Sequence, residues 1–219
     1  MQGEGVHAGT PSVFLRTYYC NLTCTWCDTK YTWLEQGKAQ AGVHYKLMKS
    51  EEILDRLTKY TCRHLVVTGG EPLLHQDTLS QLLSRLKEMG FFIEVETNGT
   101  ITPSGELVSA TDCFNVSPKI SNSLVQRAIR VRPAALEAFV KCGKAWFKFV
   151  VCQQADVSEV EDLVTACNLP RERVILMPEG TDVEMLLARG RWVAEICQQH
   201  GFRFTPRLHI LLFGNRRGT

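Results

Sequence analysis

Apolar residues along the chain fall into short runs separated by longer segments in which they recur every three or four positions. Short runs rich in apolar and β-branched residues predict buried strands. Such runs cover residues 13–16, 64–68, 91–96, 113–117, 146–151 and 174–177. Several end at turn residues, as 91–96 does before Asn98 and Gly99.

Most of these runs are separated by segments in which apolar residues have the spacing of a helix. The clearest case spans residues 77–89, where leucine and methionine occur at i, i+3, i+4, i+7 and i+10, after Asp77 as cap and before Gly90. Further helices are predicted after Ser50 to near Tyr60, over 133–142 with Pro133 in the first turn, from Asp156 with Glu159 three positions on, and over 182–200 before Gly201. Residues 37–49 have no clear period and are predicted irregular.

Strands that alternate with helices predict one α/β domain over residues 1–219, with a parallel sheet covered on its outside. About six strands are too few for an eight-stranded barrel, so we expect a partial, open barrel. In parallel α/β folds ligands gather at the carboxyl ends of the strands. Polar residues that directly follow a strand are therefore candidate site residues.

Charge and composition exclude some partners. The 25 basic and 23 acidic residues leave a formal charge of +2, which gives no field that would attract nucleic acid or a membrane surface. The chain has no run near the roughly 18 apolar residues that a membrane helix needs. We expect a cytoplasmic protein whose thiols stay reduced.

Three of the nine cysteines form a C-x3-C-x2-C run made of Cys20, Cys24 and Cys27. The spacing suits a [4Fe-4S] cluster, and three thiolates leave one iron free to bind a further ligand. A zinc site would need a fourth ligand. The candidates are His7, His44, Asp28 and Cys62, none of which has the usual short zinc spacing.

The odd number of cysteines argues against a disulfide framework. The six cysteines outside the run are isolated, and we interpret them as packing residues. They are Cys62, Cys113, Cys142, Cys152, Cys167 and Cys197.

The cysteine run resembles that of the radical S-adenosylmethionine (SAM) enzymes, in which the open iron chelates SAM. Its flanks resemble one family in particular, the 7-carboxy-7-deazaguanine synthases. The matching residues are 2–5, 9, 11, 14, 16, 20–22, 26–29, 31–32, 69–72, 96–99, 117–119 and 208–209. The resemblance implies an open α/β barrel, a [4Fe-4S] cluster, SAM and Mg²⁺.

The activity that this resemblance implies is a lyase reaction of queuosine (7-deazapurine) biosynthesis. A radical derived from SAM takes hydrogen from 6-carboxy-5,6,7,8-tetrahydropterin, and the ring contracts to 7-carboxy-7-deazaguanine with loss of ammonia. The resemblance also implies a homodimer and a one-electron donor such as flavodoxin. It implies no nucleic-acid or membrane partner, and no general base is assigned.

The resemblance assigns the SAM site as follows. The stretch through Gly69, Gly70 and Glu71 holds the methionine amino group, and two glycines after a strand would let the backbone approach a ligand. The rest of the site is formed by Asn98, Ser117, Lys119 and Pro178. Ordinary alternatives are a simple turn at the Gly-Gly-Glu-Pro and Asn-Gly strings and a solvated lysine at 119.

The substrate site is assigned in the same way. Arg16 would bind the substrate carboxylate through paired donors, and its alternative is an internal salt bridge. Thr29 would bind Mg²⁺ together with the substrate, although with Asp28 it could instead only hydrogen-bond the loop. The remaining contacts implied are Gln2, Glu4, Thr97, His209 and the terminal carboxylate of Thr219.

Two departures from the family are visible. Tyr19 stands before Cys20 where glycine is common and would add bulk beside the cluster, and relatives usually have a strand before the Gln2 motif. Two other functions remain open. A radical SAM activase would share the cysteines and residues 69–72, and a zinc-binding nucleic-acid module is a hypothesis of another class, which the near-neutral charge disfavours.

Overall fold

The computed structural model describes residues 1–34 and 45–216 and contains a seven-stranded sheet in which neighbouring strands are parallel and follow chain order. The strands are β1 (Val13–Thr17), β2 (His64–Gly69), β3 (Phe92–Thr97), β4 (Cys113–Val116), β5 (Ala145–Val151), β6 (Val174–Pro178) and β7 (Arg203–Phe204). The predicted strands and the open parallel barrel are confirmed. The two-residue strand β7 was not predicted, because it is too short to show a pattern.

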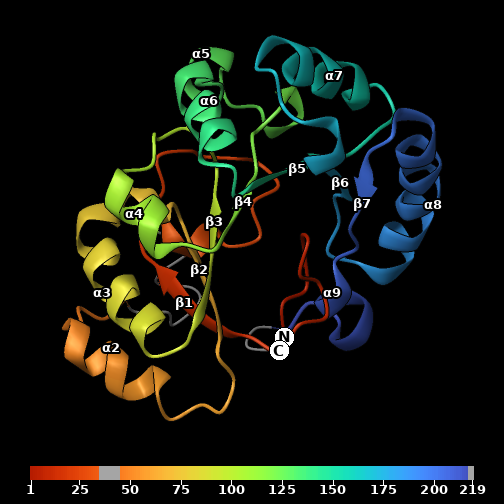
Figure 1. Cartoon of the computed structure of the whole chain (residues 1–219). Coiled ribbons are helices and arrows are strands. Elements are labelled where there is room, and N and C mark those ends of the chain that lie inside the picture. Colours follow the sequence, from red (N-terminus) through yellow and green to blue (C-terminus); the bar gives the residue numbers. More distant parts are fainter. Residues whose placement is uncertain (35–44, 217–219) are drawn as a thin grey trace.

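Helices surround the sheet on its outer side (Figure 1). They are α2 (Ser50–Leu57), α3 (Gln76–Glu88), α4 (Gly105–Ala110), α5 (Arg127–Arg130), α6 (Pro133–Cys142), α7 (Asp156–Ala166), α8 (Val183–His200) and α9 (Leu208–Phe213). Short 3-10 turns add η1 (Lys30–Thr32), η2 (Pro72–His75), η3 (Ser121–Ser123) and η4 (Arg171–Arg173). The longer helices agree with the predictions, whereas α4, α5 and α9 have too few turns to be seen in the sequence.

Three predicted helix caps are wrong. Ser50 and Asp156 are the first residues of their helices, and Asp77 lies inside α3, which begins one residue earlier after η2. The Asp156 carboxylate instead accepts the N–H group of Cys152 at 2.7 Å, and α2 ends before the predicted Tyr60.

Both predicted ends of α8 are confirmed. Asp182 caps the helix by accepting the N–H of Met185 at 3.0 Å, and Gly201 ends it with φ +68°. A left-handed residue at a helix end suits glycine, which has no β-carbon. Of the segment 37–49 that was predicted to be irregular, residues 37–44 lie outside the described residues, and residues 45–49 form neither helix nor strand.

The strands alternate between an apolar outer face and a polar inner face. In β5, Phe147 and Phe149 are fully buried in the core against the helices, while Lys148 between them points inward, since successive strand residues face opposite sides. The inner-facing polar residues are Thr68, Glu94, Glu96, Asn115 and Lys148. Buried polar groups are costly unless they are paired, so this inner face needs a network or a ligand.

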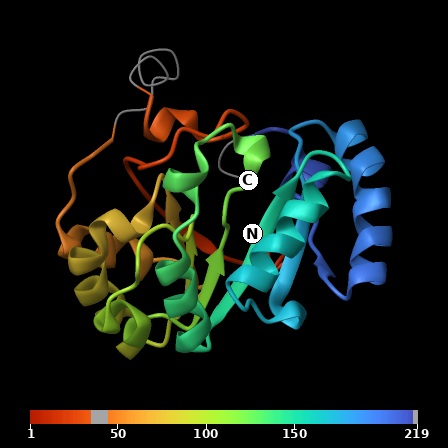
Figure 2. The same ribbon diagram turned by 90° about the horizontal axis from the view of Figure 1, so that it is seen from above.

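The start of the chain lies beside α9, on the side of the barrel between β1 and β7 (Figure 1). The N–H of Leu208 donates to the carbonyl of Gly3 at 2.8 Å, and the N–H of Gln2 donates to the carbonyl of Thr10 at 2.8 Å. Figure 2 shows the segment after β1, with η1, along one end of the barrel. None of the helices within the described ranges is both long and apolar enough to cross a membrane.

Candidate functional site

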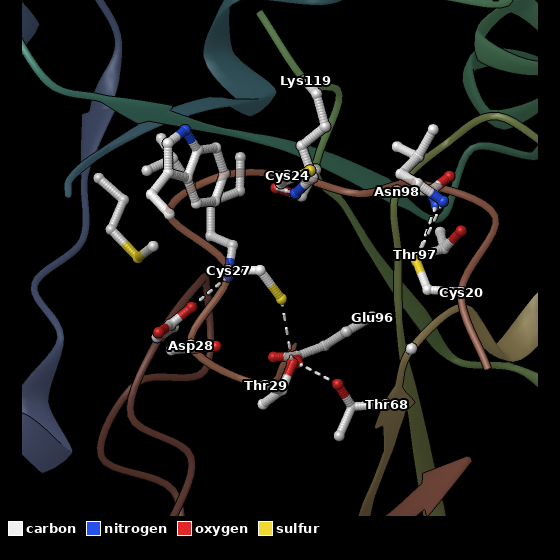
Figure 3. A pocket seen from close by; sticks show the side chains of 18 of the residues that line it. Cys20, Cys24, Cys27, Asp28, Thr29, Thr68, Glu96, Thr97, Asn98 and Lys119 are labelled. Carbon is white, nitrogen blue, oxygen red and sulfur yellow. Dashed lines mark hydrogen bonds and ion pairs between the residues drawn. The ribbon is translucent and has the colours of Figure 1, made fainter. Parts of the chain in front are cut away.

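A pocket opens at the carboxyl ends of the strands (Figure 3). Together with the open space at its mouth it encloses roughly 910 Å³. Its walls come from the cysteine loop after β1, the ends of β2–β6, the start of the chain and Arg207. Predicted residues that line it are Glu4, Cys20, Cys24, Cys27, Asp28, Thr29, Gly69, Gly70, Thr97, Asn98, Ser117 and Lys119.

The loop that carries the three thiols is fixed by its backbone. Tyr19 has φ +77°, its N–H donates to the carbonyl of Thr32 at 2.9 Å, and its carbonyl accepts the N–H of Glu71 at 2.8 Å. The Tyr19 side chain is 56% exposed and does not line the pocket, so the expected bulk beside the cluster is absent. Its positive φ explains why this position suits glycine.

Gly69 and Gly70 both lie where strand β1 and the cysteine loop approach β2. A β-carbon on Gly70 would lie 1.9 Å from the Tyr19 carbonyl oxygen, and one on Gly69 would lie 2.3 Å from the Thr17 oxygen. The glycines line the pocket, but their lack of a side chain is required by the loop itself. The glycines are thus needed for close backbone packing, whereas we expected that they would be needed for the approach of a ligand.

The three thiols meet the requirements of a cluster with an open iron. Cys20, Cys24 and Cys27 line one pocket together. The nominated fourth ligands are engaged elsewhere: His7 binds Glu94, Asp28 pairs with Arg207, and Cys62 donates to the Pro11 carbonyl. His44 lies outside the described residues. The donor set therefore fits a three-thiolate cluster.

Burial raises the pKa of the Cys20 thiol to about 11 and also raises that of Cys24. Iron binds thiolates, so loading the cluster must release these protons. The ammonium group of Lys119 stabilises a nearby thiolate and therefore opposes part of the increase in both pKa values.

Asn98, Ser117 and Lys119 lie on the rim of the pocket. The Asn98 amide donates to Asn21 Oδ1 at 2.8 Å and lies 4.0 Å from Cys20 Sγ. Lys119 Nζ is 2.9 Å from Ser117 Oγ and lies over the Trp26 ring, 5.2 Å from its centroid. The arrangement places polar donors directly beside the thiols (Figure 3).

Glu71 does not reach the pocket. Its fully buried carboxylate accepts from the Leu73 N–H at 3.0 Å, the Thr97 hydroxyl at 2.7 Å and the Asn98 N–H at 2.7 Å. Burial raises its pKa although these bonds act against the shift. In the geometry observed, Glu71 positions Thr97 and Asn98.

Thr29 and Asp28 lie next to the last thiol. The Thr29 hydroxyl is 3.5 Å from Cys27 Sγ, and Asp28 forms an ion pair with Arg207. Thr29 lines the pocket with the carboxylate-bearing Glu96, whose Oε2 accepts from Thr68 at 2.8 Å. Hydroxyl and carboxylate oxygens at one site suit Mg²⁺.

Charged partners hold the segment of residues 2–4 at the pocket. Glu4 Oε2 is 2.5 Å from Lys148 Nζ, and Glu4 Oε1 is 2.9 Å from Arg207 Nε. Burial alone would raise the pKa of Glu4, but the two cations outweigh it and hold the pKa well below its usual range. Gln2 is buried and its amide bridges Glu94 and Glu96, at 2.6 and 3.1 Å.

Besides Gln2 and Glu71, three predicted residues within the described ranges are not among those that line the pocket, namely Arg16, Pro178 and His209. Arg16 is exposed on edge strand β1, where it pairs in register with the inner-facing Thr68. His209 lies against Gly3, and burial lowers its pKa although Glu4 raises it. Pro178 is buried while its neighbours Met177 and Glu179 line the pocket. Thr219 lies outside the described residues.

Sequence reasoning missed Lys148, Arg207, Thr68, Glu96 and Asn115, all of which line the pocket. A lysine between two phenylalanines in an apolar strand was a usable sign, because strand alternation puts it on the opposite face from the core. Arg207 follows a short irregular segment and has no such pattern around it.

Comparison with known proteins gives consistent results. Residues 14–150, more than half of the chain, match the family model of the radical SAM superfamily. The 7-carboxy-7-deazaguanine synthase of Pyrobaculum aerophilum is 41% identical over 220 residues, which cover 100% of this chain and 93% of the relative. That of Escherichia coli K12 is 30% identical over 229 residues, covering 97% and 94%.

Solved structures agree with this. The crystal structure of QueE from Escherichia coli superposes with a TM-score of 0.71 at 28% identity and covers 95% of this chain and 90% of its own. SuiB from Streptococcus suis, bound to the precursor peptide SuiA, has a TM-score of 0.62 at 14% identity and covers 94% and 51%. At that identity the second likeness shows the fold alone.

Proposed function

The chain belongs to the radical SAM superfamily and, within it, to the 7-carboxy-7-deazaguanine synthases, and from this premise we propose how its pocket serves the reaction. The enzyme converts 6-carboxy-5,6,7,8-tetrahydropterin to 7-carboxy-7-deazaguanine in queuosine biosynthesis and is a carbon–nitrogen lyase. Its family implies a [4Fe-4S] cluster and SAM.

Cys20, Cys24 and Cys27 hold three irons of the cluster. When bound and reduced, the cluster supplies the electron that cleaves SAM, and the resulting radical takes hydrogen from the pterin. The protein's task is to exclude water and to leave one iron accessible, because an unprotected radical would attack other groups. The common pocket of the three thiols supports this role.

Asn98, Ser117 and Lys119, which line the pocket, would hold SAM, and the backbone of Gly69 and Gly70 would accept from its amino group. The residues next to Pro178, which line the pocket, border the adenine. Glu71 acts through Asn98 rather than by contact, as its hydrogen bond to the Asn98 N–H supports.

The pterin lies deeper, next to Glu4 and the cations Lys148 and Arg207. Glu4 is ionised there and accepts from the ring N–H groups of the substrate, while Thr97 and the buried Gln2 shape the edge of the site. Arg16 would bind the substrate carboxylate from the edge of the barrel: it does not line the pocket itself, but it is paired in register with Thr68, which does. His209 supports the Gly3 backbone.

Mg²⁺ is held by the Thr29 hydroxyl together with the substrate carboxylate. The position of Thr29 beside Cys27 and in the same pocket as Glu96 supports this assignment. Asp28 is neutralised by Arg207 and is left as a positioning residue.

The enzyme works as a homodimer and takes its electron from a one-electron donor such as flavodoxin. Exposed apolar side chains on α9, with Leu212 56% and Phe213 43% exposed, support a further protein contact on that side. Light scattering during size-exclusion chromatography tests the dimer, and reduction of the cluster by purified flavodoxin tests the donor.

The observation that carries the function is the set of three thiols placed in one pocket directly beside the ion pair of Glu4 with Lys148. The test is an anaerobic assay with SAM, Mg²⁺ and 6-carboxytetrahydropterin, in which mass spectrometry detects 7-carboxy-7-deazaguanine. Cys24→Ala should lose iron and product. Cys142→Ala, whose thiol donates to the Phe139 carbonyl outside the pocket, is the matched control and should keep both.

The assay also separates the alternatives. An activase would cleave SAM without forming the deazaguanine and would need a partner protein, and a nucleic-acid module would bind zinc without sulfide. Loaded enzyme that contains about four irons per chain but forms no product would refute the proposed roles of the pocket.

A further inference from the structure

A second group of metal-binding side chains lies near the amino-terminal ends of β2, β3 and β4, away from the pocket. His7 Nδ1, Glu94 Oε2 and Cys113 Sγ lie within 4.8 Å of one another. His64 Nε2 lies 3.0 Å from the same Glu94 oxygen but is not within 4.8 Å of every member of that group, so its ring has to shift to become a fourth ligand. The group joins the start of the chain to three neighbouring strands, and none of its members lines the pocket of the thiols.

The Glu94 carboxylate is fully buried and is the centre of this group. Its Oε2 receives His7 at 2.6 Å and His64 at 3.0 Å, while Oε1 accepts the amides of Gln2 at 2.6 Å and Asn115 at 2.5 Å. A carboxylate charge is costly to bury without a cation. Burial would raise the pKa of Glu94, but the hydrogen bonds from His64 and His7 and the charge of His7 outweigh it and lower the pKa to about 2, so the carboxylate is ionised and can bind a cation.

The thiol of Cys113 is the sulfur donor of this group. The residue is 4% exposed, and its thiol makes no hydrogen bond within the described ranges, whereas the thiols of Cys62, Cys142 and Cys197 each donate to a carbonyl. Cys113 lies opposite Glu94 in the register of β3 and β4. Its sulfur therefore lies beside the carboxylate with no protein acceptor of its own.

We propose that His7, His64, Glu94 and Cys113 bind one Zn²⁺ ion. Two nitrogens, one oxygen and one sulfur form a ligand set typical of zinc, and four protein ligands close the coordination sphere of a structural site. The carboxylate and the thiolate together neutralise the ion. Binding releases the thiol proton to solvent, and each imidazole keeps its proton on the nitrogen that faces away from the metal.

The observed distances between these side chains are hydrogen-bond distances. Around a tetrahedral ion with bonds of about 2.0 Å, ligand atoms lie about 3.3 Å apart, so the N–O pairs must open by several tenths of an ångström. His7 can make this movement because it lies in a loop and its side chain is 30% exposed, which also gives the ion a way in. Gln2 and Asn115 hold the other carboxylate oxygen, as outer hydrogen bonds do in metal sites.

The ion would act as a clamp on the start of the chain. His7 is the ligand from that segment, and Gln2 in the same segment bridges Glu94 to Glu96, which lines the pocket. Zinc at this position would thus hold the Gln2–Glu4 motif against the inner face of the barrel without taking part in the reaction.

The experiment measures zinc, iron and sulfide per chain in the anaerobically purified, cluster-loaded protein, with free Zn²⁺ fixed by a chelator buffer. We expect about one zinc per chain in addition to the cluster irons. Cys113→Ala and His7→Ala should each lower zinc occupancy at least about tenfold while iron stays unchanged. X-ray absorption at the zinc edge of the unmodified protein should show one sulfur scatterer among nitrogen and oxygen.

Two control variants make the result specific. Cys142→Ala removes a half-buried thiol outside the group and should keep its zinc. Cys24→Ala removes a cluster ligand and should lose iron but keep zinc, which excludes binding of zinc to empty cluster thiols. Zinc that is absent from the loaded protein, that persists in Cys113→Ala and His7→Ala, or that shows no sulfur neighbour would overturn the proposal. The absorption measurement decides even if a variant fails to fold.

Discussion

Arg207 lies against Glu4, with its Nε 2.9 Å from Glu4 Oε1, although 203 residues separate them in the sequence. The same guanidinium contacts Asp28, the residue after the third cluster thiol, and donates to the Gly180 carbonyl at 2.7 Å. One side chain therefore connects the start of the chain, the cysteine loop and the loop after β6. Its planar guanidinium donates to three separate acceptors at once, and a lysine could not reproduce this geometry.

Replacing this arginine should disturb substrate binding more than the cluster. Arg207→Gln leaves Glu4 with one cation and frees Asp28, and the loss of charged hydrogen bonds of about 1.5–3 kcal/mol predicts a fall in kcat/KM of roughly 10- to 100-fold. Iron content should stay within error. Arg171→Gln is the matched control, because Arg171 pairs with Glu161 at the surface. Equal kinetics in the two variants would contradict the role of Arg207.

The approach of the cysteine loop to β2 gives a second prediction. Gly70→Ala would put a β-carbon 1.9 Å from the Tyr19 carbonyl oxygen, so the backbone that carries Cys20 must shift. We expect severalfold less iron after reconstitution. Gly190→Ala, inside α8, is the control, because the new β-carbon would lie 3.7 Å from Phe204 Cζ, an ordinary contact. Alanine there should stabilise the helix by about 0.5–1 kcal/mol. Iron analysis and urea unfolding measure both effects.

The sequence was sufficient for the parts of the fold that repeat. Strands with continuous apolar runs and the helix of residues 77–89 have periods that only one secondary structure satisfies, and their alternation predicts the parallel sheet. Helix caps were less predictable. Asp156 and Asp77 both lie inside the first turn of their helices, and the Asp156 carboxylate accepts from the N–H group of Cys152. Such one-residue differences depend on tertiary contacts.

The site divides in the same way. Cys20, Cys24 and Cys27 are predictable because their ligand spacing is local. The pairing of Lys148 and Arg207 with Glu4 depends on the closure of the sheet, which brings β5 and the segment before α9 to the start of the chain. Glu71 shows the limit of motif reasoning, since its carboxylate faces the protein backbone and not the pocket.

The buried ion pairs of Glu4 predict a dependence of stability on pH. Lys148 and Arg207 hold the Glu4 pKa below its ordinary value of 4.5, so the unfolded chain takes up this proton first as the pH falls. The stabilisation is fully present above about pH 4.5 and is lost progressively below it. Glu4→Gln leaves the buried Lys148 without its ion-pair partner and Arg207 with Asp28 alone, and should destabilise the cluster-free protein at pH 7 by about 3–5 kcal/mol.

Urea unfolding at pH 7, 5 and 3 measures this difference. The gap in unfolding free energy between the unmodified chain and Glu4→Gln should be nearly equal at pH 7 and 5 and smaller at pH 3, where Glu4 is protonated in the unfolded chain but still ionised in the folded chain. Glu137→Gln is the control, since Glu137 pairs with Lys141 on the surface of α6 and should change stability little at any pH. A gap that does not change with pH would contradict the assigned ionisation.

The hydroxyl of Thr29 gives the last prediction, because it separates a metal ligand from a loop hydrogen bond. If Thr29 Oγ1 binds Mg²⁺, Thr29→Val should raise the Mg²⁺ concentration needed for half-maximal activity about tenfold or abolish the activation, since valine has the same shape but no oxygen ligand. Thr29→Ser restores the oxygen and should restore the response. The hydroxyl is 3.5 Å from Cys27 Sγ, so iron content and SAM cleavage must be measured in the same samples. A variant with normal iron, normal cleavage of SAM and an unchanged Mg²⁺ response would leave Thr29 with a structural role only, because the loss of one weak contact to sulfur cannot alter the metal dependence of the later steps.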